Sequence, residues 1–502
     1  MSIRRQSILS SLVIYIGLGV GMLNTFFFLK PQYFSATQYG LTSIFMAIAT
    51  LMMVFAMMAM PSFIYKFYPY YKDHLPPQKN DMITWALLVS TIGFGLVMIA
   101  GWFFKHLVIR KFGEHSPELL QYYYWIFPMG LGLTIYTVLE AYTNNLGKPI
   151  LTNFLKEFGW RFLTTIMILL LIMRVIGDFD LFIKLYAWGY PLLALILFCY
   201  LVFTKQIHFT FKASKVTRRY FKKIAALCLF VYGATIISTL SQVFDSIVIA
   251  SILKDGIKKA GIFGLAQVLT TIIQAPQRGI TAAAMPHLAR AWKEKNRERL
   301  QKIYHRSSIN LLIFATGIFF LISLNYTEAI VTLRLNQDFL LGFNAFLLLE
   351  LTRIIDMGTG LNAQIIGTSN YWRFELLSGV VLLLFMLPLN IILTRHYDIL
   401  GPAIANLISI SVYNIIRIIF LWKKFKLFPF TMESVYTAML GILSFGICYF
   451  LFRPIHGFGG LAIRSIAFLL LYGGGTIYLK LTPDIKPVVE TLKKRIGWKS
   501  KD

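Results

Sequence analysis

The chain has 502 residues, of which 57% are hydrophobic and 16% aromatic, and its mean hydropathy is +0.66. A soluble core of this length does not need so much apolar surface, so the composition excludes water as the main solvent and indicates a membrane protein. The formal net charge of +27 would suit a nucleic-acid-binding protein, but the Lys and Arg residues lie between apolar segments and form no basic domain, so no nucleic-acid partner is expected.

Apolar segments of about 20 residues recur along the chain, and each is long enough to cross about 30 Å of hydrocarbon as a helix. The predicted fold class is therefore an all-α polytopic membrane protein with about fourteen transmembrane helices. The predicted spans are residues 8–29, 40–63, 83–104, 118–142, 154–176, 181–204, 223–251, 260–284, 305–325, 338–361, 373–394, 400–421, 432–452 and 461–481. The first segment lacks a small-residue cleavage pattern, so it is interpreted as a retained span and not as a signal peptide.

The distribution of positive charge predicts the orientation of these spans. With the N-terminus inside, about 31 of the 49 Lys and Arg residues fall on the cytoplasmic side, chiefly in residues 205–223, 286–306 and 486–501. About 12 fall on the opposite side. We therefore expect both termini to be cytoplasmic in a bacterial inner membrane, with the basic segments also able to hold anionic lipid headgroups.

Signatures of catalysis and of cofactor binding are missing from the sequence. No segment between spans exceeds about 20 residues, which leaves no room for a soluble catalytic domain. Gly147-Lys148 lacks the upstream glycine of a P-loop, there is no HExxH pattern, and the three cysteines all lie within spans. We expect no enzyme activity, no metal and no cofactor, while proton or Na⁺ coupling stays open.

A weak internal repeat relates the two halves of the chain. Leu139-Glu140-Ala141 followed by Leu146-Gly147 parallels Leu361-Asn362-Ala363 followed by Ile366-Gly367, and Gly40 opens its span much as Gly261 does. Paired halves of this kind recur in transporters, with the substrate site at the interface of the repeats.

Two segments carry a resemblance to a known family. The first runs from Gln242-Val243-Phe244-Asp245 to Ile252, continues at Ala260-Gly261-Ile262-Phe263-Gly264-Leu265-Ala266 and closes at Ala284-Met285-Pro286. The second is Pro388-Leu389-Asn390-Ile391-Ile392-Leu393, then Gly401-Pro402-Ala403-Ile404-Ala405-Asn406, with Lys423-Lys424 at its end. They resemble the polysaccharide and O-antigen flippases of the multidrug/oligosaccharidyl-lipid/polysaccharide exporter superfamily.

The resemblance implies two pseudo-symmetric six-helix lobes around a central cavity, two additional C-terminal helices, and alternating access. We expect an N-terminal lobe at 1–215, a C-terminal lobe at 216–426, and helices 13 and 14 with a basic cytoplasmic tail at 427–502.

Polar residues inside spans are the candidate substrate contacts, because each is costly in hydrocarbon and needs a partner, a cavity or a ligand. On the eighth span, four of them fall within about 60° of one helix face, namely Gln267, Thr271, Gln274 and Arg278. On the seventh span a second stripe consists of Thr235, Ser238, Gln242 and Asp245. We expect these stripes to line a hydrated cavity, with Arg278 binding an anionic group or Asp245; interhelical hydrogen bonding is the alternative.

Charged residues on other spans are candidate ion pairs or coupling groups. Glu350, Arg353 and Asp356 follow each other at steps of three, so we expect Arg353 to neutralise both carboxylates, with proton or ion coupling as the alternative role. Glu157 and Arg161 have the i, i+4 spacing of an ion pair, and Glu140 lies near a cytoplasmic span end as a boundary or gate residue.

The sequence thus predicts a flippase that moves a polyprenyl-diphosphate-linked oligosaccharide across the inner membrane for surface polysaccharide assembly, such as O-antigen of lipopolysaccharide. Expected partners are the lipid-linked glycan, membrane lipids, and a polysaccharide polymerase or glycosyltransferases of the same pathway. Alternatives are a cation-coupled multidrug exporter, the lipid II flippase of peptidoglycan synthesis, and a membrane glycosyltransferase or polymerase.

Overall fold

The computed structural model describes residues 3–484, and their side chains except those of residues 3–12, 275, 282, 283, 372 and 376. Within that range the regular structure consists of helices, and contacts divide the chain into unit 1, Met1–Gly261, and unit 2, Ile262–Asp502. The basic segment expected at 486–501 lies outside the described residues.

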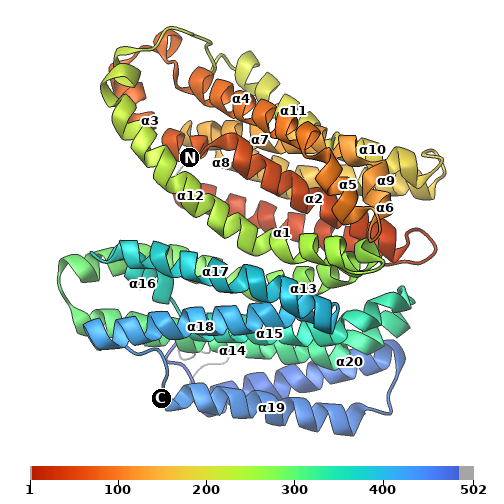
Figure 1. Cartoon of the computed structure of the whole chain (residues 1–502). Coiled ribbons are helices and arrows are strands. Elements are labelled where there is room, and N and C mark those ends of the chain that lie inside the picture. Colours follow the sequence, from red (N-terminus) through yellow and green to blue (C-terminus); the bar gives the residue numbers. More distant parts are fainter. Residues whose placement is uncertain (1–2, 485–502) are drawn as a thin grey trace. The chain divides into compact units, whose positions relative to one another are not determined.

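The described part of unit 1, from residue 3 on, contains twelve α-helices, two 3₁₀ turns and one π-helical turn (Figure 1). In chain order they are α1 (Ile3–Phe28), α2 (Ala36–Met57), α3 (Met60–His74), η1 (Pro77–Lys79), α4 (Met82–Phe103), α5 (Lys105–Phe112), α6 (Pro117–Gln121), η2 (Tyr123–Trp125), α7 (Ile126–Asn145), α8 (Pro149–Asn153), the π-helical η3 (Phe154–Gly159), α9 (Trp160–Ile172), α10 (Phe179–Ala187), α11 (Gly189–Phe203) and α12 (Lys215–Ile252). The long helix α12 packs against α2 and α3 and so belongs with unit 1.

The remaining helices, apart from the first turns of α13, form unit 2. They are α13 (Gly256–Lys293), α14 (Arg297–Thr332), η4 (Gln337–Gly342), α15 (Phe343–Gly358), α16 (Asn362–Thr368), α17 (Trp372–Tyr397), α18 (Leu400–Phe425), α19 (Met432–Phe452), α20 (Gly457–Phe468), the π-helical η5 (Leu469–Gly473) and α21 (Gly474–Tyr478). Helices α19 and α20 lie side by side and both pack on α14 (Figure 1).

Side-chain caps fix the starts of several helices. The hydroxyl of Ser35 accepts the backbone N–H of Gln38, whose side chain returns the bond, which is a capping box at the start of α2. The side-chain oxygens of Ser214 and Asn296 accept one backbone N–H each and so cap α12 and α14. These caps satisfy N–H groups that have no partner inside the helix.

Every predicted span corresponds to a helical segment, and among residues 3–484 ten helical segments are long and apolar enough to cross a membrane by themselves. Among the others, the first span appears as the shorter apolar helix Val13–Phe28. The fifth begins with the π-helical turn η3 and continues as α9, and the tenth joins η4 to the short helix α15. The expected fold class, a polytopic all-α membrane protein with about fourteen transmembrane helices, is confirmed.

The two units contain similar turns, but not at the paired positions of the sequence repeat, because Leu139–Ala141 lies within α7 whereas Leu361 precedes α16 and Gly367 lies inside it. In unit 1, α7 ends at a turn where Gly147 has φ +76° and is followed by the short helix α8. In unit 2, α15 ends at a turn where Gly360 has φ +66° and is followed by the short helix α16. Glycine suits both turns because positive φ costs it nothing.

Gly40 and Gly261 also meet at a crossing inside unit 1. A Cβ added to Gly40 would lie 1.9 Å from the carbonyl oxygen of Ile257, and one added to Gly261 would lie 2.8 Å from Cα of Gly40. Only glycine allows α2 and the first turns of α13 to approach so closely.

The lobe boundaries expected at residues 215 and 426 stay predictions.

Candidate functional site

The polar face of α13 lies in unit 2 and is called here the α13 stripe: Gln267, Thr271, Gln274 and Arg278. Thr271 and Arg278 are exposed, whereas Gln267 and Gln274 are half-buried. Pro276 lies within α13, yet the helix continues to Lys293. The stripe therefore stays on one continuous helix.

Gln274 connects the α13 stripe to α15. With its amide oxygen turned toward Arg353, Gln274 accepts hydrogen bonds from Nη1 at 2.9 Å and from Nε at 3.2 Å of that guanidinium. This two-pronged contact uses the edge of the guanidinium that usually grips a carboxylate. A neutral amide occupies that edge, so the positive charge of Arg353 is not cancelled by it.

Two arginine charges thus lie on or beside the α13 stripe without an ion pair. In the described part of the chain, Arg278 makes no hydrogen bond or ion pair, and Arg353 has no carboxylate oxygen within 4.0 Å. Arg278 is also exposed, so a ligand can reach it. An arginine with neither a protein counter-ion nor burial is available to bind an anion.

The carboxylates of α15 differ from the expected arrangement. Both oxygens of Glu350 are buried and have no hydrogen-bond partner, whereas Asp356 Oδ1 accepts from Asn414 Nδ2 at 3.0 Å. Steps of three residues on an α-helix turn by about −60° each, so Glu350 and Asp356 lie about 120° apart around α15. Within the described residues Arg353 hydrogen-bonds to α13 and has neither carboxylate within 4.0 Å, so the expected neutralisation of both carboxylates stays a prediction.

A buried polar network on α16, α17 and α18 was missed from the sequence, and we call it the Arg417 network. Arg417 on α18 is 5% exposed, pairs with Glu375 of α17 and contacts the Tyr413 hydroxyl, with its guanidinium 3.7 Å from the Tyr413 ring centre. Asn414 joins in through its Oδ1, which accepts from Asn362 Nδ2 at 2.8 Å. The signal was present, because Arg417 and Glu375 are charges inside predicted spans and so need a reason to be there.

Unit 1 pairs its intramembrane charges. Arg161 Nη1 lies 2.6 Å from Glu157 Oε2, which confirms the predicted i, i+4 ion pair, and Lys156 Nζ lies 3.1 Å from Glu140 Oε2. The first pair is held against α1, where Asn24 Nδ2 donates to the backbone oxygen of Arg161 at 2.7 Å. The partner of Glu140 was not predicted, because Lys156 is 16 residues away and reaches it only through the turn after α7.

The second expected stripe lies on α12. Ser238 and Gln242 are exposed, with Gln242 Nε2 donating to Ser238 Oγ at 3.4 Å, whereas Asp245 is 2% exposed. Asp245 belongs to unit 1 and Arg278 to unit 2. Their pairing, and a cavity lined by both stripes, stay predictions.

Comparison with solved structures identifies the fold. A structure titled as the lipid II flippase MurJ in an inward closed conformation matches with a TM-score of 0.72 at 15% identity, covering 94% of this chain and 99% of that one. An inward-facing multidrug resistance MATE family transporter of the MOP superfamily matches with a TM-score of 0.60 at 16% identity, covering 85% and 95%. An outward-facing one matches at 0.53 and 14% identity, covering 88% and 96%.

No protein-family description and no curated relative matches this chain. The similarity to these solved structures therefore establishes the fold, that of multi-pass membrane transporters, and the chain is a multi-pass membrane protein.

Proposed function

We propose that this protein is an alternating-access flippase that moves a polyprenyl-diphosphate-linked oligosaccharide from the cytoplasmic to the periplasmic leaflet of the inner membrane. The observation that carries the proposal is the pair of arginines at the α13 stripe: Arg278 is exposed and unpaired, and Arg353 is held by an amide, not by a carboxylate. Both statements concern the described residues of unit 2. An α13 stripe with two arginine charges and no carboxylate on them suits an anionic substrate.

The chemistry of a lipid diphosphate fits the α13 stripe. A guanidinium binds phosphate oxygens through two parallel N–H donors, and charge-assisted bonds of this type are about twice as strong as neutral ones. Thr271, Gln267 and Gln274 supply hydroxyl and amide groups for sugar hydroxyls. Moving those sugar groups through hydrocarbon unpaired would cost several kcal/mol each, and a hydrated polar path lowers that barrier without chemistry.

The fold supports transport, and the arginines at the α13 stripe favour a flippase of an anionic lipid over an exporter of cationic drugs. A multidrug exporter of cations would need acidic or aromatic groups at its site, whereas the α13 stripe presents arginine. Lipid II flipping is the second candidate, and the specific observation in its favour is that the structure of the lipid II flippase MurJ matches with a higher TM-score, 0.72, than the inward-facing MATE transporter, 0.60.

Glu350 is the proposed coupling group. Its carboxyl is fully buried on α15, beside the arginine that contacts the α13 stripe, and no described residue offers either oxygen a hydrogen bond. A carboxylate charge there is costly unless an ion or a proton accompanies it. We propose that Glu350 takes up and releases a proton during the transport cycle. The expected partners, a polysaccharide polymerase and glycosyltransferases of the same pathway, are likewise proposals.

Reconstituted protein tests the function directly. Purified protein is placed in liposomes that contain a fluorescent polyprenyl-diphosphate oligosaccharide, lipid II, or an encapsulated cationic dye, and a membrane-impermeant quencher measures the exchange between leaflets. We expect rapid exchange of the oligosaccharide lipid and no dye efflux. Exchange of lipid II alone would favour the second candidate, and dye efflux without lipid exchange would contradict flipping.

A further inference from the structure

A basic pocket lies in unit 2, away from the α13 stripe, and has a volume of about 630 Å³. The start of α14, the loop between α18 and α19, and the residues after α21 form it. Its five strong cations are Arg297, Lys302, Arg306, Lys426 and Lys480. The same walls carry two carboxylates, Glu298 and Glu433, so positive charge is in excess.

Only one of the five cations has an acidic partner within the described residues. Arg306 pairs with Asp484, and this guanidinium holds the pKa of the Asp484 carboxyl below its ordinary value. For Arg297, Lys302, Lys426 and Lys480 the described part of the chain provides no ion pair. Four like charges around one cavity repel each other, and a bound anion removes that repulsion.

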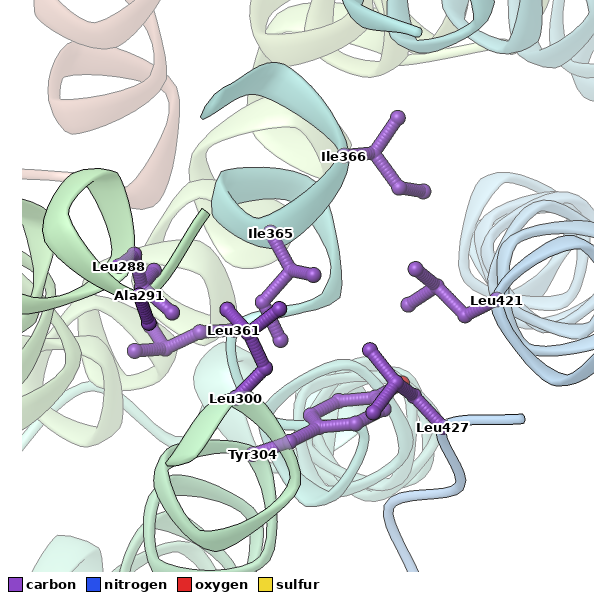
Figure 2. Close-up of a cluster of buried hydrophobic side chains, with 9 residues drawn as sticks. All are labelled: Leu288, Ala291, Leu300, Tyr304, Leu361, Ile365, Ile366, Leu421 and Leu427. Atoms are coloured by element: carbon purple, nitrogen blue, oxygen red, sulfur yellow. The ribbon is translucent and has the colours of Figure 1, made fainter. Parts of the chain in front are cut away.

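The pocket has a built, partly apolar interior. Leu427 and Leu481 are 2% and 1% exposed, and Phe425 also lines the cavity. Beneath it, Leu427 packs in the buried cluster that Figure 2 shows, with Leu300 and Tyr304 of α14. Gln301 fastens the α18–α19 loop through both ends of its amide, accepting from the N–H of Phe428 at 3.1 Å and donating to its oxygen at 2.6 Å.

The place of the pocket in the topology suggests its ligand. The start of α14, the end of α18 and the end of α21 all fall on the side that the positive-inside rule assigns to the cytoplasm. That leaflet carries anionic lipids, and basic pockets between transmembrane helices on this side hold such headgroups. A free phosphate needs only the cations, whereas the half-buried Phe425 and the exposed Pro483 also offer apolar contact to the glycerol and upper acyl chains of a lipid.

We propose that the basic pocket is a binding site for the phosphate headgroup of an anionic phospholipid drawn from the cytoplasmic leaflet. The site is distinct from the α13 stripe and does not depend on what the protein transports. Bound there, the lipid connects α14, the α18–α19 loop and the end of α21 through one phosphate.

Lysine footprinting of the full-length wild-type protein tests the site without mutation. Protein in neutral detergent is acetylated with an amine-reactive reagent, alone or with phosphatidylglycerol, phosphatidylcholine or inorganic phosphate, and modification is read by mass spectrometry. We expect phosphatidylglycerol to protect Lys302, Lys426 and Lys480 several-fold. Equal protection by inorganic phosphate alone, or by phosphatidylcholine, would overturn the lipid assignment.

A matched pair of triple variants tests it independently. Lys302→Ala/Lys426→Ala/Lys480→Ala removes three pocket charges, whereas the control removes three exposed lysines of the basic segment on the same expected face, namely Lys212→Ala/Lys215→Ala/Lys222→Ala. At about fivefold in affinity per lysine near an anionic headgroup, the pocket variant should bind phosphatidylglycerol about 100-fold more weakly. The control should bind phosphatidylglycerol as the wild type does. An equal loss of affinity in both triple variants would show that general surface charge, and not the pocket, binds the lipid.

Discussion

The two units differ in how completely they pair charges inside the membrane, although unit 2 also contains the pair Arg417–Glu375. In unit 1, Glu157 has Arg161 at 2.6 Å and Glu140 has Lys156 at 3.1 Å. In unit 2, within the described residues, Arg278 and Arg353 have no carboxylate oxygen within 4.0 Å and Glu350 has no hydrogen bond. Paired charges stabilise the fold that holds them, whereas unpaired ones call for a ligand, which is why the candidate site lies in unit 2.

The Arg417 network offers the largest expected effect, because it is a paired charge inside unit 2. If a paired charge is structural in unit 2 as well, Arg417→Ala should destabilise the protein by about 2–3 kcal/mol, because Glu375, whose side chain is 26% exposed, loses its partner. Thermal inactivation in detergent and membrane abundance measure this. The exposed Arg395→Ala on α17 serves as the control, and wild-type thermal stability of Arg417→Ala would show that the network is not structural.

Arg278 makes the opposite prediction. Arg278→Ala should leave abundance unchanged and lower transport about 10- to 100-fold, since one charge-assisted hydrogen bond contributes about 1.5–3 kcal/mol. Arg278→Lys should keep part of the activity because the charge remains but the two-pronged geometry is lost.

The matched control for Arg278 is on the same helix. Arg290 lies twelve residues further along α13 and already has an acidic partner, Glu294, at 2.6 Å. Arg290→Ala should therefore transport normally. Equal transport by Arg278→Ala and Arg290→Ala would remove Arg278 from the mechanism.

Local features of this site could be predicted from the sequence, and distant contacts could not. Helical periodicity fixes which residues share a face, so the α13 stripe and the Glu157–Arg161 pair followed from spacing alone. The contact of Gln274 with Arg353 joins residues 79 positions apart on two helices, and that of Arg417 with Glu375 spans 42 positions. Spacing along one helix carries no information on which neighbour a long side chain reaches.

The fold followed from composition because the bilayer permits few spanning structures. Backbone groups in hydrocarbon must be satisfied internally, so apolar segments of this length become helices. What sequence did not show is where those helices break. The π-helical turn η3, which contains Lys156 and Glu157, replaces α-helix at the start of the fifth span without a proline or glycine before Gly159.

The unit 1 pair should behave as a structural ion pair of moderate strength. Glu157 and Arg161 are about a quarter exposed, so solvent screens them and we expect a coupling free energy of about 1 kcal/mol. A double-mutant cycle with Glu157→Gln and Arg161→Gln measures it from thermal stability. The exchanged pair Glu157→Arg/Arg161→Glu should recover part of the stability, and a coupling of zero would contradict the pairing.

Glu350 should show the smallest effect on stability and so sharpens the comparison most. Glu350→Gln removes a buried charge that no described group bonds, while the amide keeps the size of the side chain, so the free energy of unfolding should not fall, because the uncompensated carboxylate is itself costly there. The same change in unit 1, Glu157→Gln, breaks a pair and should cost more. Because Gln cannot carry a proton, Glu350→Gln should exchange substrate between leaflets but lose the acceleration that an imposed pH gradient gives to the wild type. Retained acceleration in Glu350→Gln would assign coupling elsewhere, and a loss of stability larger than that of Glu157→Gln would show that the buried carboxyl is held by the fold after all.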